Sequence, residues 1–247
     1  MAKRSIPEIN AGSMADIAFL LLIFFLVTTT MDKDTGMLRQ MSVKIDVPED
    51  MQIDVRKRNL MKIRANAQNQ IQVRSELTDI ADIKEKVDYF YKANMFTDAD
   101  GDFPEYLTVN KYTCDTSIVA IEKFLDANDD PAFVEFKEAE RREWEKRLNV
   151  INTLKGPYRE MHRSAAIQIE LQTKTHYEIL ISIMNEVKSA INDIRDEKGK
   201  EIFGIPYRTM VQKRDLDGKG NLFKDEISLL EILVPERIVE LKPADLQ

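Results

Sequence analysis

Asp16 is the residue of this chain most clearly suited to chemistry, because it is an ionisable side chain beside a long apolar run. It is the one formal charge between Ile9 and Met31, and residues 17–27 after it are all apolar. A carboxylate at the centre of a bilayer costs about 2.5–3.5 kcal/mol on insertion scales. It escapes that cost by taking up a proton or by facing a polar cavity between partner helices. Asp16 is therefore a candidate proton-relay residue, with an interfacial helix cap as the alternative.

The apolar segment around Asp16 is long enough to cross a membrane. A helix over residues 9–31 reaches about 30 Å, the thickness of the hydrocarbon core. A secretory signal peptide is the alternative, but residues 28–34 lack a small-residue cleavage pattern. We therefore expect an uncleaved, single-pass transmembrane helix at 13–31. Positive charges are nearly balanced on its two sides, so the short N-terminal segment and long C-terminal part alone favour an inward N-terminus.

The same segment resembles the signature of a known family. Glu8-Ile-Asn10, then Asp16, then Phe19-Leu-Leu-Leu-Ile-Phe-Phe-Leu-Val-Thr-Thr29 are similar to the N-terminal signature of the ExbD/TolR family of biopolymer-transport proteins. One departure precedes the carboxylate: family members usually carry a Thr-Pro or similar pair there, whereas this chain has Gly12-Ser13. The departure affects the expected backbone geometry before Asp16 and leaves the carboxylate in place.

The resemblance implies a role in energy transduction. Its members are single-pass inner-membrane proteins with a cytoplasmic N-terminus and a periplasmic α/β domain, and Asp16 occupies the place of their proton-responsive residue. The resemblance further implies that two copies of the chain form a homodimer in the lipid membrane, surrounded by a pentamer of a multi-pass ExbB-like protein. It also implies a TonB-like partner that opens outer-membrane transporters. A single helix cannot form a proton path alone, so a multi-pass partner also follows from physics. The alternative is a TolR-like envelope interaction module that binds peptidoglycan or a Ca²⁺-dependent partner without proton chemistry.

A second motif lies near the C-terminus and could bind calcium. Its candidate ligands are Asp215, Asp217, Asn221 and Glu226. Their spacing, with Gly220 at the sixth position, is that of an EF-hand loop. Lys219, however, places a cation where a ligand oxygen is expected, and no entering helix is predicted before the loop. We therefore favour a turn between two strands and expect no metal site.

The remaining composition argues against an enzyme and against a nucleic-acid partner. The net charge is −7, and phosphate binding requires a clustered basic surface. Cys114 is the single cysteine, which excludes an intrachain disulfide, and is expected to be a packed thiol. His162 and His176 are the two histidines and are expected at the surface. No phosphate loop or nucleophile motif occurs, so we expect no catalytic site and no cofactor.

The elements downstream of the anchor begin as a small α/β domain. Alternating apolar and polar residues predict a strand at 43–47. Segments 60–64 and 70–74 flank a polar turn and predict a β-hairpin. A helix that Thr78 or Asp79 can cap follows. Its apolar face consists of Ile80, Ile83, Val87 and Phe90.

The same strand-then-helix pattern returns later in the chain. Residues 165–171 predict a strand, and a long helix follows that Gly199 is expected to end. The apolar stripe of this helix consists of Tyr177, Leu180, Ile181, Met184, Val187, Ile191 and Ile194. Segment 227–241 contains two β-prone runs that Pro235 separates, and one of them is expected to complete a sheet.

Residues 93–160 are predicted to be a helical insertion. Asp115 is expected to open a short helix, and Asp130-Pro131 to begin a longer one that stops at Gly156-Pro157. The expected fold class is therefore α/β (α+β): one transmembrane helix, then a small periplasmic two-layer domain with this insertion. The expected boundaries are an N-terminus at 1–12, the transmembrane helix at 13–31, a linker at 32–42 and the domain at 43–247. The family resemblance is strong over 8–30, moderate over 43–91 and 165–194, and absent from the insertion and the tail after Gly199.

Overall fold

The computed structural model describes residues 18–24, 56–98, 100–127, 130–218 and 220–241. The chain divides into two compact units, Met1–Gln52 and Ile53–Gln247. In the first unit, the described residues 18–24 are helical. The strand expected at 43–47 lies outside the described residues. The second unit contains all of the sheet structure that is described, and it has a mixed α/β architecture.

A five-stranded sheet forms the base of the second unit, in the order β3-β2-β1-β6-β7. Three consecutive antiparallel strands, β1 (Leu60–Ala65), β2 (Ile71–Val73) and β3 (Glu76–Thr78), follow the short 3₁₀ turn η2 (Lys57–Asn59). Two parallel strands, β6 (Ala166–Leu171) and β7 (Ile238–Leu241), extend the sheet beyond β1. The predicted hairpin and the predicted strand at 165–171 are therefore confirmed.

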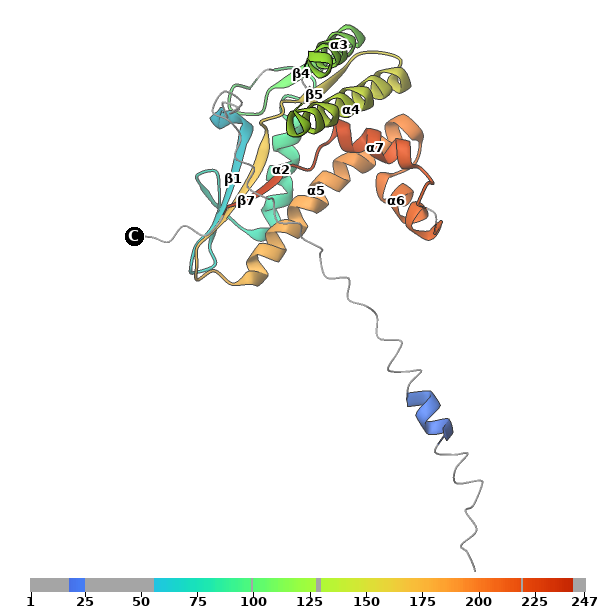
Figure 1. Ribbon diagram of the computed structural model, residues 1–247. Coiled ribbons are helices and arrows are strands. Elements are labelled where there is room, and N and C mark those ends of the chain that lie inside the picture. The colour runs from blue at the N-terminus through green and yellow to red at the C-terminus, as the bar shows by residue number, and fades with distance from the viewer. Residues whose placement is uncertain (1–17, 25–55, 99, 128–129, 219, 242–247) are drawn as a thin grey trace, which may run out of the picture. The chain divides into compact units, whose positions relative to one another are not determined.

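One face of this sheet is apolar and covered by helices. Ile63 on β1 and Ile167 on β6 are fully buried under α2 (Ile80–Lys92) and α5 (Tyr177–Phe203) (Figure 1). The alternation of side chains along a strand places polar residues on the opposite face. The five-stranded sheet and the helices α2 and α5 thus form two layers around one core. We call this part the α/β module.

The long helix α5 does not end where the sequence predicts. It continues through Gly199 to Phe203 and ends at Gly204, whose φ of 72° is left-handed. Gly199 serves close packing instead. A Cβ at this position would lie 2.7 Å from the carbonyl oxygen of Ile205, so only glycine allows the next segment to approach the helix.

The predicted insertion is helical but is anchored by two strands. The antiparallel strands β4 (Tyr106–Val109) and β5 (Tyr158–Met161) form a second sheet, and α3 (Lys111–Ala127) and α4 (Pro131–Leu154) lie between them in sequence. The strands β4 and β5 were not predicted from the sequence. The expected helix start at Asp115 is also wrong, because α3 begins four residues earlier. There the side chain of Asn110 accepts a hydrogen bond from the Thr113 N–H at 2.8 Å, a capping contact.

The tail after α5 adds two further helices and the last strand. These helices are α6 (Tyr207–Leu216) and α7 (Lys224–Leu233). The first β-prone run of segment 227–241 is therefore a helix, whereas the second is β7 and completes the sheet, as predicted. The tail helices pack with the insertion around a second hydrophobic core. Its buried members are Val109, Cys114, Val150, Ile151, Tyr158, Tyr207, Met210, Ile227, Leu229 and Leu230. We call α3, α4, α6 and α7 the helical lobe.

Candidate functional site

The predicted proton site, Asp16, lies outside the described residues, but the helical turns that follow it are described. From Phe19 to Phe24, each apolar side chain exposes 42–60% of its surface. Exposed apolar side chains in such a continuous run are normally covered by a membrane or by a partner. Of the helices in the described ranges, none combines the length and the apolarity that crossing a bilayer demands. The transmembrane helix at 13–31 therefore stays a prediction.

The candidate calcium loop joins two helices, so the expected turn between two strands is wrong. It follows α6 and precedes α7, and Gly218 and Gly220 turn the chain with left-handed φ values of 62° and 66°. Helix–loop–helix is the arrangement of an EF-hand. The carboxylates nevertheless do not converge. Within the described residues, no group of three acidic, histidine or cysteine side chains is placed to hold a metal ion, and Lys219 lies outside them.

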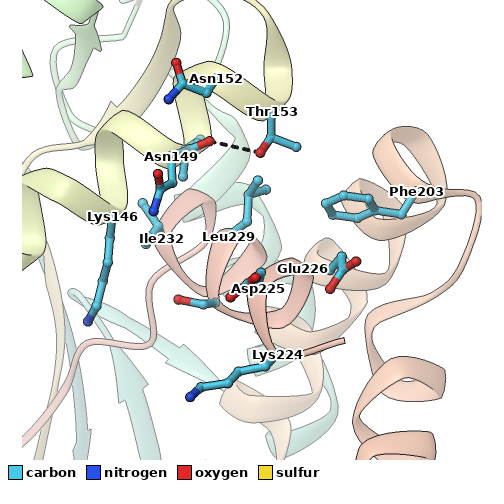
Figure 2. A pocket seen from close by; sticks show the side chains of 12 residues that line it. Lys146, Asn149, Asn152, Thr153, Phe203, Lys224, Asp225, Glu226, Leu229 and Ile232 are labelled. Carbon is cyan, nitrogen blue, oxygen red and sulfur yellow. Dashed lines mark hydrogen bonds between the residues drawn. The ribbon is translucent and has the colours of Figure 1, made fainter. Parts of the chain in front are cut away.

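The individual ligands of that loop have other surroundings. Asp215 accepts hydrogen bonds from the guanidinium of its neighbour Arg214 at 3.0 Å. Glu226 lies on α7 and lines a groove between α4 and α7 (Figure 2). Asp217 lies at the C-terminal end of α6, and the carboxylates of Asp215, Asp217 and Glu226 do not form a group that could hold a cation. The geometry of the loop gives calcium binding no support.

The groove between α4 and α7 belongs to the helical lobe and has a volume of about 630 Å³. Figure 2 shows Leu229 and Ile232 on α7 facing the α4 residues Asn149 and Thr153. Its charged lining is mixed in sign, with two lysines and two carboxylates. The lining contains no histidine or cysteine.

A buried ion pair attaches α4 to the second sheet. The Arg147 guanidinium donates two hydrogen bonds of 2.7 Å to the Glu160 carboxylate, and both side chains are nearly inaccessible to solvent. Burial alone lowers the pKa of Arg147, but the Glu160 carboxylate outweighs this effect and raises it. The Tyr158 hydroxyl donates to Glu160 at 3.3 Å, and Arg237 of the tail approaches it to 3.7 Å. One carboxylate thus links the insertion, the second sheet and the tail.

Sequence reasoning missed this ion pair. Its one signal is that Arg147 stands three and four residues before Val150 and Ile151, on the apolar stripe of α4. A charge on such a stripe indicates a buried partner, but the sequence does not show which one. Glu160 lies thirteen residues away, across the turn between α4 and β5.

The other residues singled out by sequence have structural surroundings. Cys114 is fully buried, and burial raises the pKa of its thiol, so it is the packed cysteine that the sequence predicts. His162 is half-buried rather than at the surface. Its Nδ1 lies 2.8 Å from the hydroxyl of Ser164, which also accepts a hydrogen bond from Asn59. His176 is exposed at the start of α5, as expected.

The described structure is thus an α/β module with a helical lobe, in a chain that also carries a short apolar helical segment. The profile of the family described as Biopolymer transport protein ExbD/TolR matches residues 2–195. No curated protein and no solved structure shows a significant match to this chain. The match covers most of the sequence, so the chain belongs to the ExbD/TolR family. The matched range ends within α5, and α6, α7 and β7 lie beyond it.

Proposed function

We propose that this chain is the ExbD-like subunit of an inner-membrane motor that the proton-motive force drives and that energises TonB-dependent outer-membrane transport. The observation that carries the proposal is the family match, which begins before Asp16 and includes the apolar run after it. Asp16 is the one formal charge between Ile9 and Met31, so it is the residue that can carry a proton within this segment. The exposed apolar side chains of residues 18–24 support a membrane or partner-helix environment.

In the proposed assembly, the N-terminus is cytoplasmic and the α/β module with its helical lobe is periplasmic. Two copies of this chain place their transmembrane helices inside a pentamer of a multi-pass ExbB-like protein. Protonation of Asp16 removes the charge of the carboxylate, and release of the proton restores that charge. The protonated and ionised states therefore differ in how the helix contacts its polar surroundings. The periplasmic part transmits the resulting movement to a TonB-like protein. The chain itself performs no enzymatic step in this proposal and needs no cofactor.

The test is the substitution Asp16→Asn in the full-length chain. Asparagine keeps the size and a polar amide, so insertion, abundance and co-purification with the multi-pass partner are expected to match wild type. It cannot exchange a proton, so substrate uptake through outer-membrane transporters is expected to fall to the level of a deletion strain. Uptake is measured with a labelled substrate, and protein level is checked by blot.

The matched control is Asp32→Asn, which removes a carboxylate just beyond the other end of the apolar run. This control is expected to leave uptake unchanged. Normal uptake by the Asp16→Asn variant would reject the proton site and favour the envelope interaction module instead. Because asparagine is also a good N-cap, a purely capping Asp16 predicts the same normal uptake.

A further inference from the structure

A groove of about 690 Å³ lies in the α/β module, between α2 and the turn that joins β2 to β3. It is distinct from the groove of the helical lobe, because the two share no residue. Its floor is aromatic, with Phe90 and Phe103 beneath it and the exposed ring of Tyr89 at one side. Tyr89 packs edge-to-face on Phe103 with ring centroids 4.8 Å apart. The groove thus offers an apolar surface that is not closed over by the described chain.

The rim of this groove is predominantly acidic. Four carboxylates and two cations line it. The carboxylates are Glu76, Asp82, Glu85 and Asp88. Glu76 pairs with Lys86 and Asp88 with Lys92, whereas Asp82 and Glu85 form no ion pair with any described residue. Asp82 and Glu85 are three residues apart on α2, so they project from the same side of the helix.

The groove already holds one cation of the chain itself. The guanidinium of Arg74 lies 4.3 Å from the ring centroid of Phe103 and 5.8 Å from that of Phe90. It also donates a hydrogen bond to the carbonyl oxygen of Asp102 at 2.8 Å. The faces of aromatic rings attract cations, and the effect strengthens where water is excluded. The position of Arg74 shows that this aromatic floor accommodates a cation. Tyr89 and the two carboxylates that pair with no described residue, Asp82 and Glu85, remain accessible.

We propose that this groove binds a cationic segment of a partner protein, whose lysine or arginine side chains meet Asp82 and Glu85 and stack on Tyr89. Charge complementarity selects this occupant. An acidic or purely apolar segment would cover the two carboxylates without giving them a partner, and burial of an unpaired charge is unfavourable. The inference does not depend on the proton chemistry of Asp16, because α2 and its groove lie in the other unit of the chain.

The test uses the full-length chain in neutral detergent micelles and a fluorescein-labelled peptide that alternates lysine with valine. Binding is followed by fluorescence anisotropy at low ionic strength, where exposed charges are least screened. The variant Asp82→Lys/Glu85→Lys is expected to bind this peptide at least about tenfold more weakly, because two attractions become repulsions. The matched control, Glu122→Lys/Asp126→Lys on α3, changes the net charge equally at exposed residues and is expected to weaken binding less than about twofold.

Two further measurements make the result specific. Tyr89→Ala is expected to weaken binding about threefold to fivefold without any change of charge, because it removes the accessible ring. Asp16→Asn is expected to bind like wild type, which separates this site from the proposed proton site. Equal losses in the two charge-reversal variants would overturn the proposal, since binding would then follow net charge alone. Equal affinity for a peptide with glutamate in place of lysine would overturn it as well, as would the absence of binding by the wild-type chain.

Discussion

Glu160 attaches the insertion to the rest of the second unit through its charge, because its buried carboxylate faces both Arg147 and Arg237. Replacing it by glutamine keeps the shape but leaves the Arg147 charge with only the half-exposed Glu143 carboxylate, 3.9 Å away, as a counter-ion. We expect Glu160→Gln to lower the free energy of unfolding by about 3 kcal/mol, the scale for breaking a buried pair. Urea unfolding followed by the fluorescence of Trp144 measures this, since that ring packs against the Arg147 guanidinium and is the single tryptophan.

The matched control is Glu138→Gln on the same helix. Glu138 is half-exposed and pairs with Arg142 at 3.7 Å. Exposed pairs contribute about 0–1 kcal/mol, so this substitution is expected to change stability little. Equal effects of the two substitutions would show that the Glu160 charge is not needed to hold Arg147.

Gly199 gives a second prediction at the level of one residue. Alanine is ordinarily better than glycine inside a helix by about 1 kcal/mol. Here the new Cβ would lie 2.7 Å from the Ile205 carbonyl oxygen and 3.1 Å from the Tyr207 nitrogen, and both are backbone atoms that cannot move independently. We therefore expect Gly199→Ala to destabilise the protein by about 1–3 kcal/mol, the range for overpacking. Thermal unfolding of the full-length chain measures it.

Gly101→Ala is the control for this prediction. A Cβ at Gly101 meets no atom within 4 Å, and its φ is not left-handed. This variant is expected to keep the wild-type melting temperature. A stabilised Gly199→Ala variant would mean that helix propensity outweighs the contact with the following turn.

At the scale of elements, the sequence predicts those whose apolar residues repeat regularly. The hairpin, α2, β6 and α5 bury residues at periods of two or of three and four, and all four are confirmed. Segment 227–233 could not be assigned in this way, because the spacing of Ile227, Leu229 and Leu230 suits either a strand or a helix. Packing in the lobe selects the helix. A short apolar run cannot be assigned by periodicity alone.

Three other elements had no usable pattern. Along α6 only Tyr207 and Met210 are buried, so its mostly polar sequence shows no helical pattern before the candidate calcium loop. The strands β4 and β5 pair with each other across α3 and α4, and each is four residues long. Pairing over such a distance is specified by tertiary contacts and not by local sequence. For the same reason, the buried Arg147–Glu160 pair was not predictable.

Asp193 on α5 connects three helices and makes their packing sensitive to acid. Its carboxylate pairs with Lys84 of α2 and with Arg208 of α6, each at 2.6 Å. Burial alone raises the pKa of Asp193, but the hydrogen bonds and charges of Lys84 and Arg208 outweigh it and lower the pKa. The stability that this carboxylate contributes is therefore present above its unfolded pKa of about 4 and lost as the pH falls through the folded pKa.

We accordingly expect Asp193→Asn to destabilise the protein at pH 7 by about 0.5–1 kcal/mol, a small value because the carboxylate is partly exposed. The difference from wild type is expected to shrink as the pH falls below about 4, where the wild-type carboxylate also loses its charge. Urea unfolding at a series of pH values measures the difference. A difference that is constant down to pH 3 would show that shape rather than charge decides the effect.

The loop between α6 and α7 gives a prediction about metal. Its helix–loop–helix form resembles an EF-hand more than the sequence indicated, yet its acidic side chains do not converge. With Lys219 at a ligand position, we expect no calcium binding tighter than roughly millimolar. Calorimetric titration of the full-length chain measures it. A micromolar site that Glu226→Ala removes would contradict the prediction.

At the scale of the whole molecule, the sequence indicates the segment that could carry proton chemistry but not the grooves at the surface. Asp16 and its apolar run are recognisable because a charge in that context is rare. The grooves beside α2 and α7 are assembled from segments far apart in the chain, so no local pattern marks them. The family match includes α3 and α4 of the helical lobe, where no resemblance was expected, whereas α6 and α7 lie beyond it.

The two hydrophobic cores of the second unit are joined by α5. Ile191 and neighbouring residues of this helix lie in the core of the α/β module, whereas Ile202 and Phe203 at its end pack against the core of the helical lobe. Arg195, buried on the same helix, donates to the Val234 carbonyl at 3.0 Å and to the Tyr207 hydroxyl at 3.3 Å. A continuous helix with contacts to both cores couples their unfolding, because neither core can lose it without exposing apolar surface in the other.

We therefore expect the α/β module and the helical lobe to unfold in one cooperative transition. Met210→Ala removes a fully buried side chain of the lobe and is expected to cost about 2–5 kcal/mol. If the cores are coupled, this variant lowers the midpoint of the unfolding transition that Trp144 reports in the lobe. The β1 and β6 amides then also exchange faster, and the free energy calculated from their exchange falls by the same amount. Ile191→Ala, in the other core, is expected to shift both probes as well. Faster exchange in β1 and β6 with an unchanged Trp144 transition in Ile191→Ala would show that the helical lobe folds independently.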